Sequence, residues 1–115
     1  MPLVAITLSN DLFESVREKL LREVSAVVAT TLDTSEAGLQ ITLRQAHSLF
    51  GGESGPTAFV EVRSPGKLDA NTTSRLAREL CALLEIEADV PPERVFLNFM
   101  EVSRGDWGWN GKLLP

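Results

Sequence analysis

The sequence predicts one domain, residues 1–115, of the α/β (α+β) class, in which two βαβ repeats form a four-stranded sheet. Three observations lead to this prediction. A chain of 115 residues fits one domain with one small core. β-rich runs alternate with amphipathic helical segments, and the order strand, helix, strand occurs twice at similar length. Right-handed crossovers would then place both helices on the same face of the sheet.

The first repeat occupies residues 2–46. Residues 2–8 are apolar at nearly every position, which is typical of a strand covered on both faces. A helix is expected over residues 11–31, because apolar residues recur there at helical spacing opposite a charged face. Asp11 and Glu14 have the spacing of a capping box at its start. Residues 32–38 break the period and predict a turn, and residues 39–46 alternate as a half-buried strand does.

The second repeat follows the glycine-rich segment 51–56, which is the strongest loop signal in the chain. We expect a strand at 57–63, a turn at Ser64-Pro65-Gly66 and a helix with a leucine stripe over residues 71–87. The Pro91-Pro92 pair ends the secondary-structure element before it, and a strand is expected after it at 95–100. The tail at 105–111 predicts a short edge strand or a hairpin.

The predicted fold leaves one face of the sheet without helices, although its strands read as buried on both sides. A monomer cannot satisfy that pattern. We therefore expect neighbouring copies of the chain to cover the bare face, with the tryptophan-containing tail helping to join them.

Composition excludes several classes of function. The net charge of -5 and the pI near 4.8 argue against nucleic-acid binding, which requires a basic surface. No apolar segment is long enough to span a membrane and the first residues do not read as a signal peptide, so a cytoplasmic location is expected, with non-classical secretion as the alternative. A single cysteine and a single histidine provide no transition-metal cluster, and Gly66-Lys67 lacks the other residues of a P-loop. We expect neither a metal nor a cofactor.

Pro2, directly behind Met1, is the residue that most strongly suggests chemistry. Removal of Met1 would leave a secondary amine at the chain end, and α-amino groups titrate near 8. Partial burial disfavours the charged form and would bring that value toward neutrality, where an amine is an effective base. A proline at the start of a strand also has an ordinary structural explanation, since that position tolerates it.

Several short motifs together resemble the macrophage migration inhibitory factor and D-dopachrome tautomerase branch of the tautomerase superfamily. Their order and spacing fit from end to end of the chain; they are Met1-Pro2-Leu3, Leu49-Phe50-Gly51-Gly52, Ser64-Pro65-Gly66-Lys67, Pro92-Glu93-Arg94-Val95 and Gly108-Trp109-Asn110. The resemblance implies a homotrimer with active sites between subunits. It also implies that the terminal proline moves a proton between the keto and enol forms of phenylpyruvate-like or dopachrome-like compounds.

The resemblance also indicates which residues would bind the substrate. Asn98 matches the pocket asparagine of the family. Asp33 stands where the family has a lysine that pairs with a substrate carboxylate, so the charge is reversed. Pro65 replaces an isoleucine and keeps its carbonyl but has no N–H to donate. Phe96 replaces a tyrosine and keeps the ring without the hydroxyl, and Trp107 would reshape the apolar wall or pack at the interface.

Three readings of function remain open. The first is a keto–enol tautomerase for small enolisable carbonyl compounds, acting through Pro2 and weak on carboxylated substrates because of Asp33. The second is a trimeric signalling or binding protein with a decayed pocket and an unknown receptor. The third is another reaction of the superfamily, such as hydration or dehalogenation, which would require cations near the proline, with Arg44 and Arg104 as the candidates.

Overall fold

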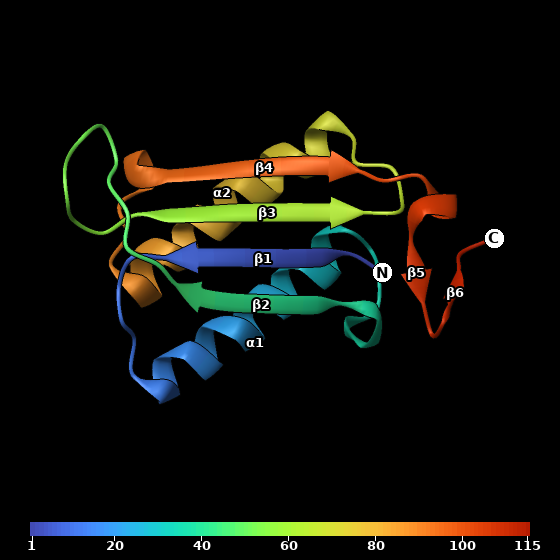
Figure 1. Cartoon of the computed structure of the whole chain (residues 1–115), viewed down its shortest axis with the longest axis horizontal. Helices are drawn as coiled ribbons and strands as arrows, with labels where there is room; N and C mark the ends of the chain where they lie inside the picture. The colour runs from blue at the N-terminus through green and yellow to red at the C-terminus, as the bar shows by residue number, and fades with distance from the viewer.

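The predicted α+β architecture is confirmed by the computed structural model, which describes residues 1–115 (Figure 1). Four strands form the main sheet, two helices cover one of its faces, and single 3-10 turns (η) join some of the elements. In chain order the elements are β1 (Leu3–Leu8), α1 (Glu14–Thr31), η1 (Glu36–Gly38), β2 (Gln40–Gln45), β3 (Ala58–Ser64), α2 (Ala70–Ala88), η2 (Pro92–Arg94), β4 (Val95–Glu101), η3 (Arg104–Asp106), β5 (Gly108–Trp109) and β6 (Lys112–Leu113).

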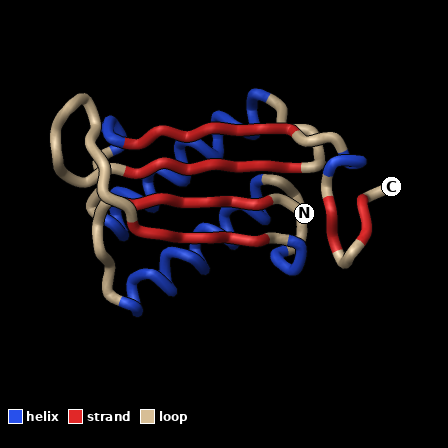
Figure 2. The backbone as a smooth tube through the Cα atoms, in the orientation of Figure 1, coloured by secondary structure: helices blue, strands red, loops and turns tan.

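The strand order is β2-β1-β3-β4, so the first strand of each repeat lies in the middle of the sheet, which is labelled in Figure 1 and drawn in red in Figure 2. β1 runs parallel to β2, and β3 runs parallel to β4, as expected for two βαβ units. The two units join through an antiparallel pairing of β1 with β3, in which Leu3 lies opposite Arg63. The starts of β1 and β2 and the ends of β3 and β4 therefore lie at the same end of the sheet.

The core lies between the sheet and the two helices. It consists of alternate residues of the strands together with one stripe from each helix, and its fully buried large side chains are Val4, Ile6, Leu8, Val60 and Val62 from the strands, Leu20, Val24, Val28, Leu76, Leu80 and Leu84 from the helices, and Val90. Each such side chain contributes at most about 1.5–3 kcal/mol relative to exposure. Neither helix has an apolar stretch suited to crossing a bilayer.

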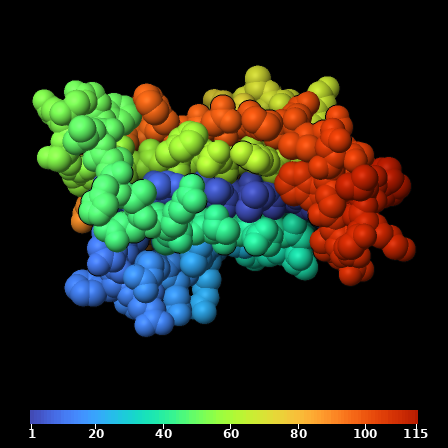
Figure 3. Space-filling model, in the orientation of Figure 1, coloured from blue at the N-terminus to red at the C-terminus, as the bar shows by residue number.

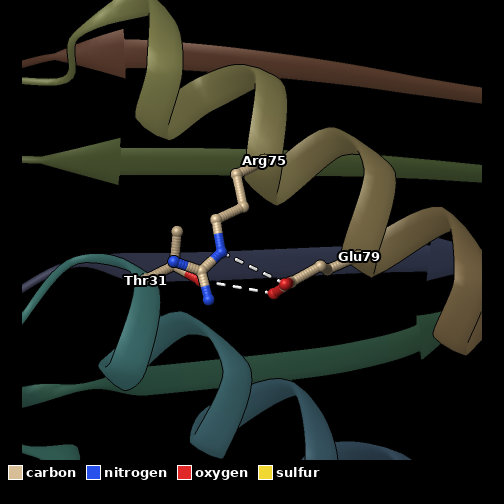
Figure 4. Close-up of polar contacts among 3 residues, drawn as sticks. All are labelled: Thr31, Arg75 and Glu79. Carbon is tan, nitrogen blue, oxygen red and sulfur yellow. Dashed lines mark hydrogen bonds and ion pairs between the residues drawn. The ribbon is translucent and has the colours of Figure 1, made fainter.

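The two helices lie side by side and run in opposite directions. Where α1 ends, Thr31 Oγ1 donates to Glu79 of α2 at 3.4 Å, and Arg75 Nε lies 3.2 Å from the same carboxylate (Figure 4). At the opposite end, Asn10 Nδ2 donates to the carbonyl of Ala88 at 2.7 Å. The ion pair is largely exposed and adds little free energy, so the buried stripes hold the helices together.

The start of the first helix differs from the prediction. α1 begins at Glu14, three residues later than expected, and Phe13 is its N-cap residue without any side-chain hydrogen bond. A capping box needs Glu or Gln three residues after the cap, and with the cap at Phe13 that position is Val16. The predicted capping box of Asp11 and Glu14 is therefore wrong. The second helix begins one residue early, at Ala70.

The second face of the sheet carries no helix and is exposed in the chain (Figure 3). Phe59, Phe96 and Met100 are exposed on it, and every second residue of β1 is only half-buried. One face of β1 is therefore left uncovered within one chain, as the sequence predicted, because both helices pack on the opposite side. Coverage by neighbouring copies remains a prediction.

The tail forms the predicted hairpin, and its second strand extends to Leu113. Asn110 and Gly111 have φ angles of 53° and 77°, which is the pattern of a type I′ hairpin turn. The hairpin lies beyond the end of the main sheet, beside the N-terminus (Figure 1). It pairs with none of the strands of the main sheet.

Candidate active site

Pro2 lies directly before the central strand β1, and it is buried. The N–H of Gln40 donates to the Pro2 carbonyl at 3.2 Å, which continues the pairing with β2 by one residue. Because β1 is bonded on both sides, the position of the chain end is set by the sheet. A proline fits here since the first residue of a strand needs no N–H for the ladder.

A hollow of about 260 Å³ opens beside Pro2. Its walls come from the chain terminus, the connection between η1 and β2, and the C-terminal hairpin; they are Met1, Pro2, Leu3, Ala37, Gly38, Leu39, Gln40, Trp107, Gly108 and Trp109. A β-carbon built on Gly38 would lie 3.9 Å from the Met1 nitrogen, so this segment passes directly beside the terminus. The hollow therefore combines a terminal nitrogen with largely apolar walls.

The surroundings of the Met1 amine lower its pKa below the ordinary value near 8. Burial is the larger cause, because it removes water from the ammonium form, and the positive charge of Arg104 is the second. Both causes favour the neutral amine, which is the form that can accept a proton.

Arg104 is held close to this end of the sheet by η3 and the tail. The N–H of Val102 donates to the Ser64 carbonyl at 2.8 Å, and Arg104 follows two residues later. The Nε of Arg104 donates to the Pro115 carbonyl oxygen at 3.0 Å, which ties the guanidinium to the end of the hairpin. Arg104 is thus a cation near the Met1 amine. Of the two candidate cations from the sequence, Arg44 and Arg104, it is the one whose charge lowers the pKa of that amine.

Asp33 and Pro65 lie at the same end of the molecule as Pro2, but neither lines the hollow. Asp33 is exposed, follows the C-cap residue of α1 and has a φ of 51°. Pro65 is buried in the turn after β3, where the Ser64 hydroxyl oxygen accepts from the N–H of Gly66 at 3.1 Å. The structure brings Pro2 and Trp107 together on one surface and places Asp33 and Pro65 at the same end of the molecule.

Phe96 and Asn98 lie farther along the sheet. The register aligns Thr7 with Phe59 and Phe59 with Phe96, so Phe96 is opposite the far end of β1 from Pro2. The five residues from Phe96 to the end of β4 span about 17 Å along the strand direction. Neither Phe96 nor Asn98 lines the hollow at Pro2. Both are exposed on the helix-free face, where a second chain would reach them.

Sequence reasoning missed several wall residues, notably Trp109, Gly38 and Gln40. Trp109 belongs to a motif that carries the family resemblance, and its position in the hairpin turns it toward the terminus. No sequence signal marks Gly38 or Gln40, since their place depends on how η1 leads into β2. No three side chains among His, Cys, Asp and Glu gather closely enough to bind a metal ion.

Comparison with known proteins gives a consistent result. The family model described as macrophage migration inhibitory factor matches residues 1–115. Macrophage migration inhibitory factor from Rattus norvegicus is 32% identical over 62 residues, and this match covers 54% of each chain, little more than half of the relative's length. The structure of a homologue of that factor from Prochlorococcus marinus superposes with a TM-score of 0.93 at 30% identity, covering 98% of this chain and 99% of the other. A similar protein from Entamoeba histolytica has a TM-score of 0.94 at 24% identity, with 98% of both chains covered.

The amine pKa is open to direct titration. In the chain that carries Met1, we expect NMR titration to give a terminal amine pKa below 8, and Arg104→Gln to raise it because a neighbouring cation is lost. Arg44→Gln is the matched control: Arg44 lies opposite Thr7, at the other end of β1, and should leave the pKa unchanged. Equal values for wild type and Arg104→Gln would remove Arg104 from the site.

Proposed function

The chain belongs to the macrophage migration inhibitory factor family, whose model it matches throughout, and on this premise we propose that it is a keto–enol tautomerase that uses Pro2 as its general base. The observation that carries the proposal is the position of Pro2, a buried residue directly before the central strand and beside a hollow. The amine of Met1, which lies next to it, has a lowered pKa. The proposed reaction requires no metal and no cofactor.

The base has to be generated first. While Met1 is attached, the Pro2 nitrogen is an amide whose lone pair is delocalised, and it cannot accept a proton. Removal of Met1 leaves a secondary amine at the same place, directly before β1. Burial and the charge of Arg104 would then act on this amine as they act on that of Met1.

In the proposed reaction the neutral Pro2 nitrogen removes a proton from the carbon next to the substrate carbonyl. The electrons of the broken C–H bond form the enolate, and the proline becomes a secondary ammonium. The same nitrogen then returns the proton to the oxygen, which gives the enol, and the reverse sequence gives the ketone. A positive charge near the site, such as that of Arg104, stabilises the negative charge that develops on the oxygen.

The remaining roles need a second copy of the chain. We propose that Asn98 of a neighbouring copy donates its amide N–H to the substrate oxygen and that Phe96 of that copy forms an aromatic wall. Trp107 supplies the apolar wall on the side of Pro2, and the Pro65 carbonyl is an acceptor close to the strand end. The separation of β4's first residues from Pro2 within one chain supports this arrangement, as does the exposed sheet face. A homotrimer, with three such sites, is the assembly we propose.

Asp33 sets the proposed preference among substrates. Its carboxylate is exposed on the end of the molecule where Pro2 lies, so it repels a substrate carboxylate that approaches there. Small enolisable carbonyl compounds without a carboxylate are therefore the favoured substrate class. We propose that the protein acts in the cytoplasm, with non-classical secretion as the alternative.

One observation favours a second function. The exposed anion at Asp33 replaces the cation with which the family resemblance would pair a substrate carboxylate. A trimeric binding or signalling protein with an inactive pocket would tolerate that change. It predicts negligible turnover and a Pro2 amine with an ordinary pKa, and its receptor would be a protein of unknown identity.

Pro2→Gly tests the base. We expect the variant to lose at least roughly tenfold in kcat/KM for phenylpyruvate enol–keto conversion, because a general base contributes 10²–10⁴-fold and glycine retains a primary amine. For wild type, kcat/KM should rise with pH and level off above the amine pKa, since only the neutral amine accepts a proton. Intact mass must establish that Met1 is absent from both proteins. Equal rates for the two processed proteins would count against the proposal.

Asp33→Asn tests the substrate preference. We expect KM for phenylpyruvate to fall roughly two- to fivefold at low salt and the gain to shrink at high salt, because an exposed charge is removed. KM for the methyl ester should not change. Asp89→Asn is the matched control: Asp89 is also an exposed, left-handed residue at the end of a helix, with φ 55°, but it follows α2 at the opposite end of the molecule. An equal effect of both variants would contradict a local role for Asp33.

A further inference from the structure

Arg94 is the last residue of η2, directly before β4. Its guanidinium organises the glycine-rich loop at residues 51–56, which lies before β3 in the sequence. Its Nε donates to the Pro56 carbonyl at 2.6 Å, and its Nη2 donates to the carbonyls of Glu53 and Gly55 at 3.2 and 3.4 Å. The Arg94 carbonyl accepts from the buried Thr57 hydroxyl at 2.8 Å. Arg94 takes part in none of the ion pairs of the chain, so its donors serve the loop backbone.

The loop has a backbone shape that suits this contact. Phe50 and Glu53 exchange two backbone hydrogen bonds, of 3.0 and 3.1 Å, around Gly51 and Gly52. Both glycines have positive φ, as a two-residue type I′ turn requires. Arg94 therefore reaches a carbonyl of the turn itself, at Glu53, and fixes the turn relative to the start of β4.

Phe50 connects Arg94 with the proposed substrate wall. The Arg94 Cζ lies 5.4 Å from the centroid of the Phe50 ring, within the range of a cation–π contact. The Phe50 centroid in turn lies 4.9 Å from that of Phe96, with the planes tilted by 49°. Phe50, Phe59 and Phe96 border a hollow of about 180 Å³ on the helix-free face.

The contact with Phe50 is the aromatic ring contact that Phe96 makes in the chain. Phe96 is 65% exposed on the edge strand β4, and its side chain has no hydroxyl with which to make a hydrogen bond. Phe50 is the one aromatic ring that packs against it in the chain. A continuous series of contacts thus leads from the exposed ring through Phe50 to Arg94 and the loop.

We propose that Arg94 is a positioning residue that fixes the Phe96 ring through Phe50 and thereby sets the preference of the site for substrates with an aromatic group. This inference rests on the proposed function, in which Phe96 forms the wall of a site on a neighbouring copy. Arg94 takes no part in the proton transfer. Its loss should change the recognition of an aryl group and leave the chemical step intact.

The test is a double-mutant cycle of Phe50→Leu, which keeps apolar bulk but removes the ring, and Arg94→Met, which removes the charge and the donors. For each single variant we expect KM for phenylpyruvate enol to rise roughly 3- to 10-fold, with kcat within twofold. KM for the enol of 2-oxobutanoate, which has no ring, should stay unchanged. The double variant should be no worse than either single one, because the two residues act in one chain of contacts.

Conservative variants separate positioning from folding. Phe50→Tyr keeps the ring and should behave as wild type, and Arg94→Lys keeps the cation and should recover part of the aryl preference. If Arg94→Met does not fold, the Lys and Phe50 variants still decide the question. Additive effects in the double variant, a loss in kcat, or equal KM changes for both substrates would overturn the proposal.

A second measurement keeps the proposal independent of turnover. Wild type and Pro2→Gly are assayed alongside, and equal rates for these two would refute the proposed function. In that event, binding of methyl 3-phenylpropanoate, which carries the ring but no 2-oxo group, is followed by NMR in the same variants. Weaker binding by Phe50→Leu and Arg94→Met, with Phe50→Tyr unchanged, supports the positioning role, and equal binding by all four proteins overturns it.

Discussion

The two-sided pairing of β1 is the interaction on which the rest of the structure depends. This strand bonds to β2 on one side and to β3 on the other, and it joins the two βαβ units into one sheet. A chain terminus is ordinarily among the most mobile parts of a domain unless it is tied into a sheet. Here the first residues pair with neighbouring strands, and the hydrogen bond from the N–H of Gln40 to the Pro2 carbonyl extends this pairing to Pro2. A reactive group placed at the start of this strand has a fixed position without any dedicated loop.

The same arrangement separates the proposed site residues within one chain. β1 and β3 run in opposite directions, so the beginning of β4 lies far from the beginning of β1. The helices cover one face of the sheet, and the other face keeps Phe59, Phe96 and Met100 exposed. Exposed apolar patches of this kind mark surfaces that bind other molecules. Both features support the proposed assembly, in which the helix-free face of one copy would meet the terminal hollow of another.

The sequence predicted the elements of the fold well, because their signals are local. Alternation in β2 correctly predicts a half-buried strand, and the leucine stripe of α2 places core residues correctly. The glycines at 51, 52 and 111 mark turns that need positive φ. The start of α1 was wrong because capping depends on which residue adopts the extended backbone of the cap, and Phe13 gives no chemical signal for it. The apolar run at residues 2–8 indicates burial on both faces, and within one chain the helices cover only one of them, because hydropathy does not show which element or which copy provides the cover.

The candidate site was less predictable than the fold. Pro2 was identified from its chemistry and its place behind Met1, and Trp107 from the resemblance. The role of Arg104 followed only from the structure, since η3 and the contact with Pro115 determine where the guanidinium lies. The chain of contacts from Arg94 through Phe50 to Phe96 is equally invisible in the sequence, because it joins a loop to a strand more than forty positions away.

The central claim is that each site takes its base from one copy of the chain and its oxygen donor from another. Subunit mixing tests this most directly: Pro2→Gly and Asn98→Ala proteins, each of low activity, are unfolded, combined in equal amounts, refolded and assayed for enol–keto conversion. Random assembly places an intact Pro2 beside an intact Asn98 in about one quarter of shared sites, so activity should return to about that fraction of wild type. Activity no higher than the mean of the two parent proteins, with mixed oligomers shown to form, would contradict the account.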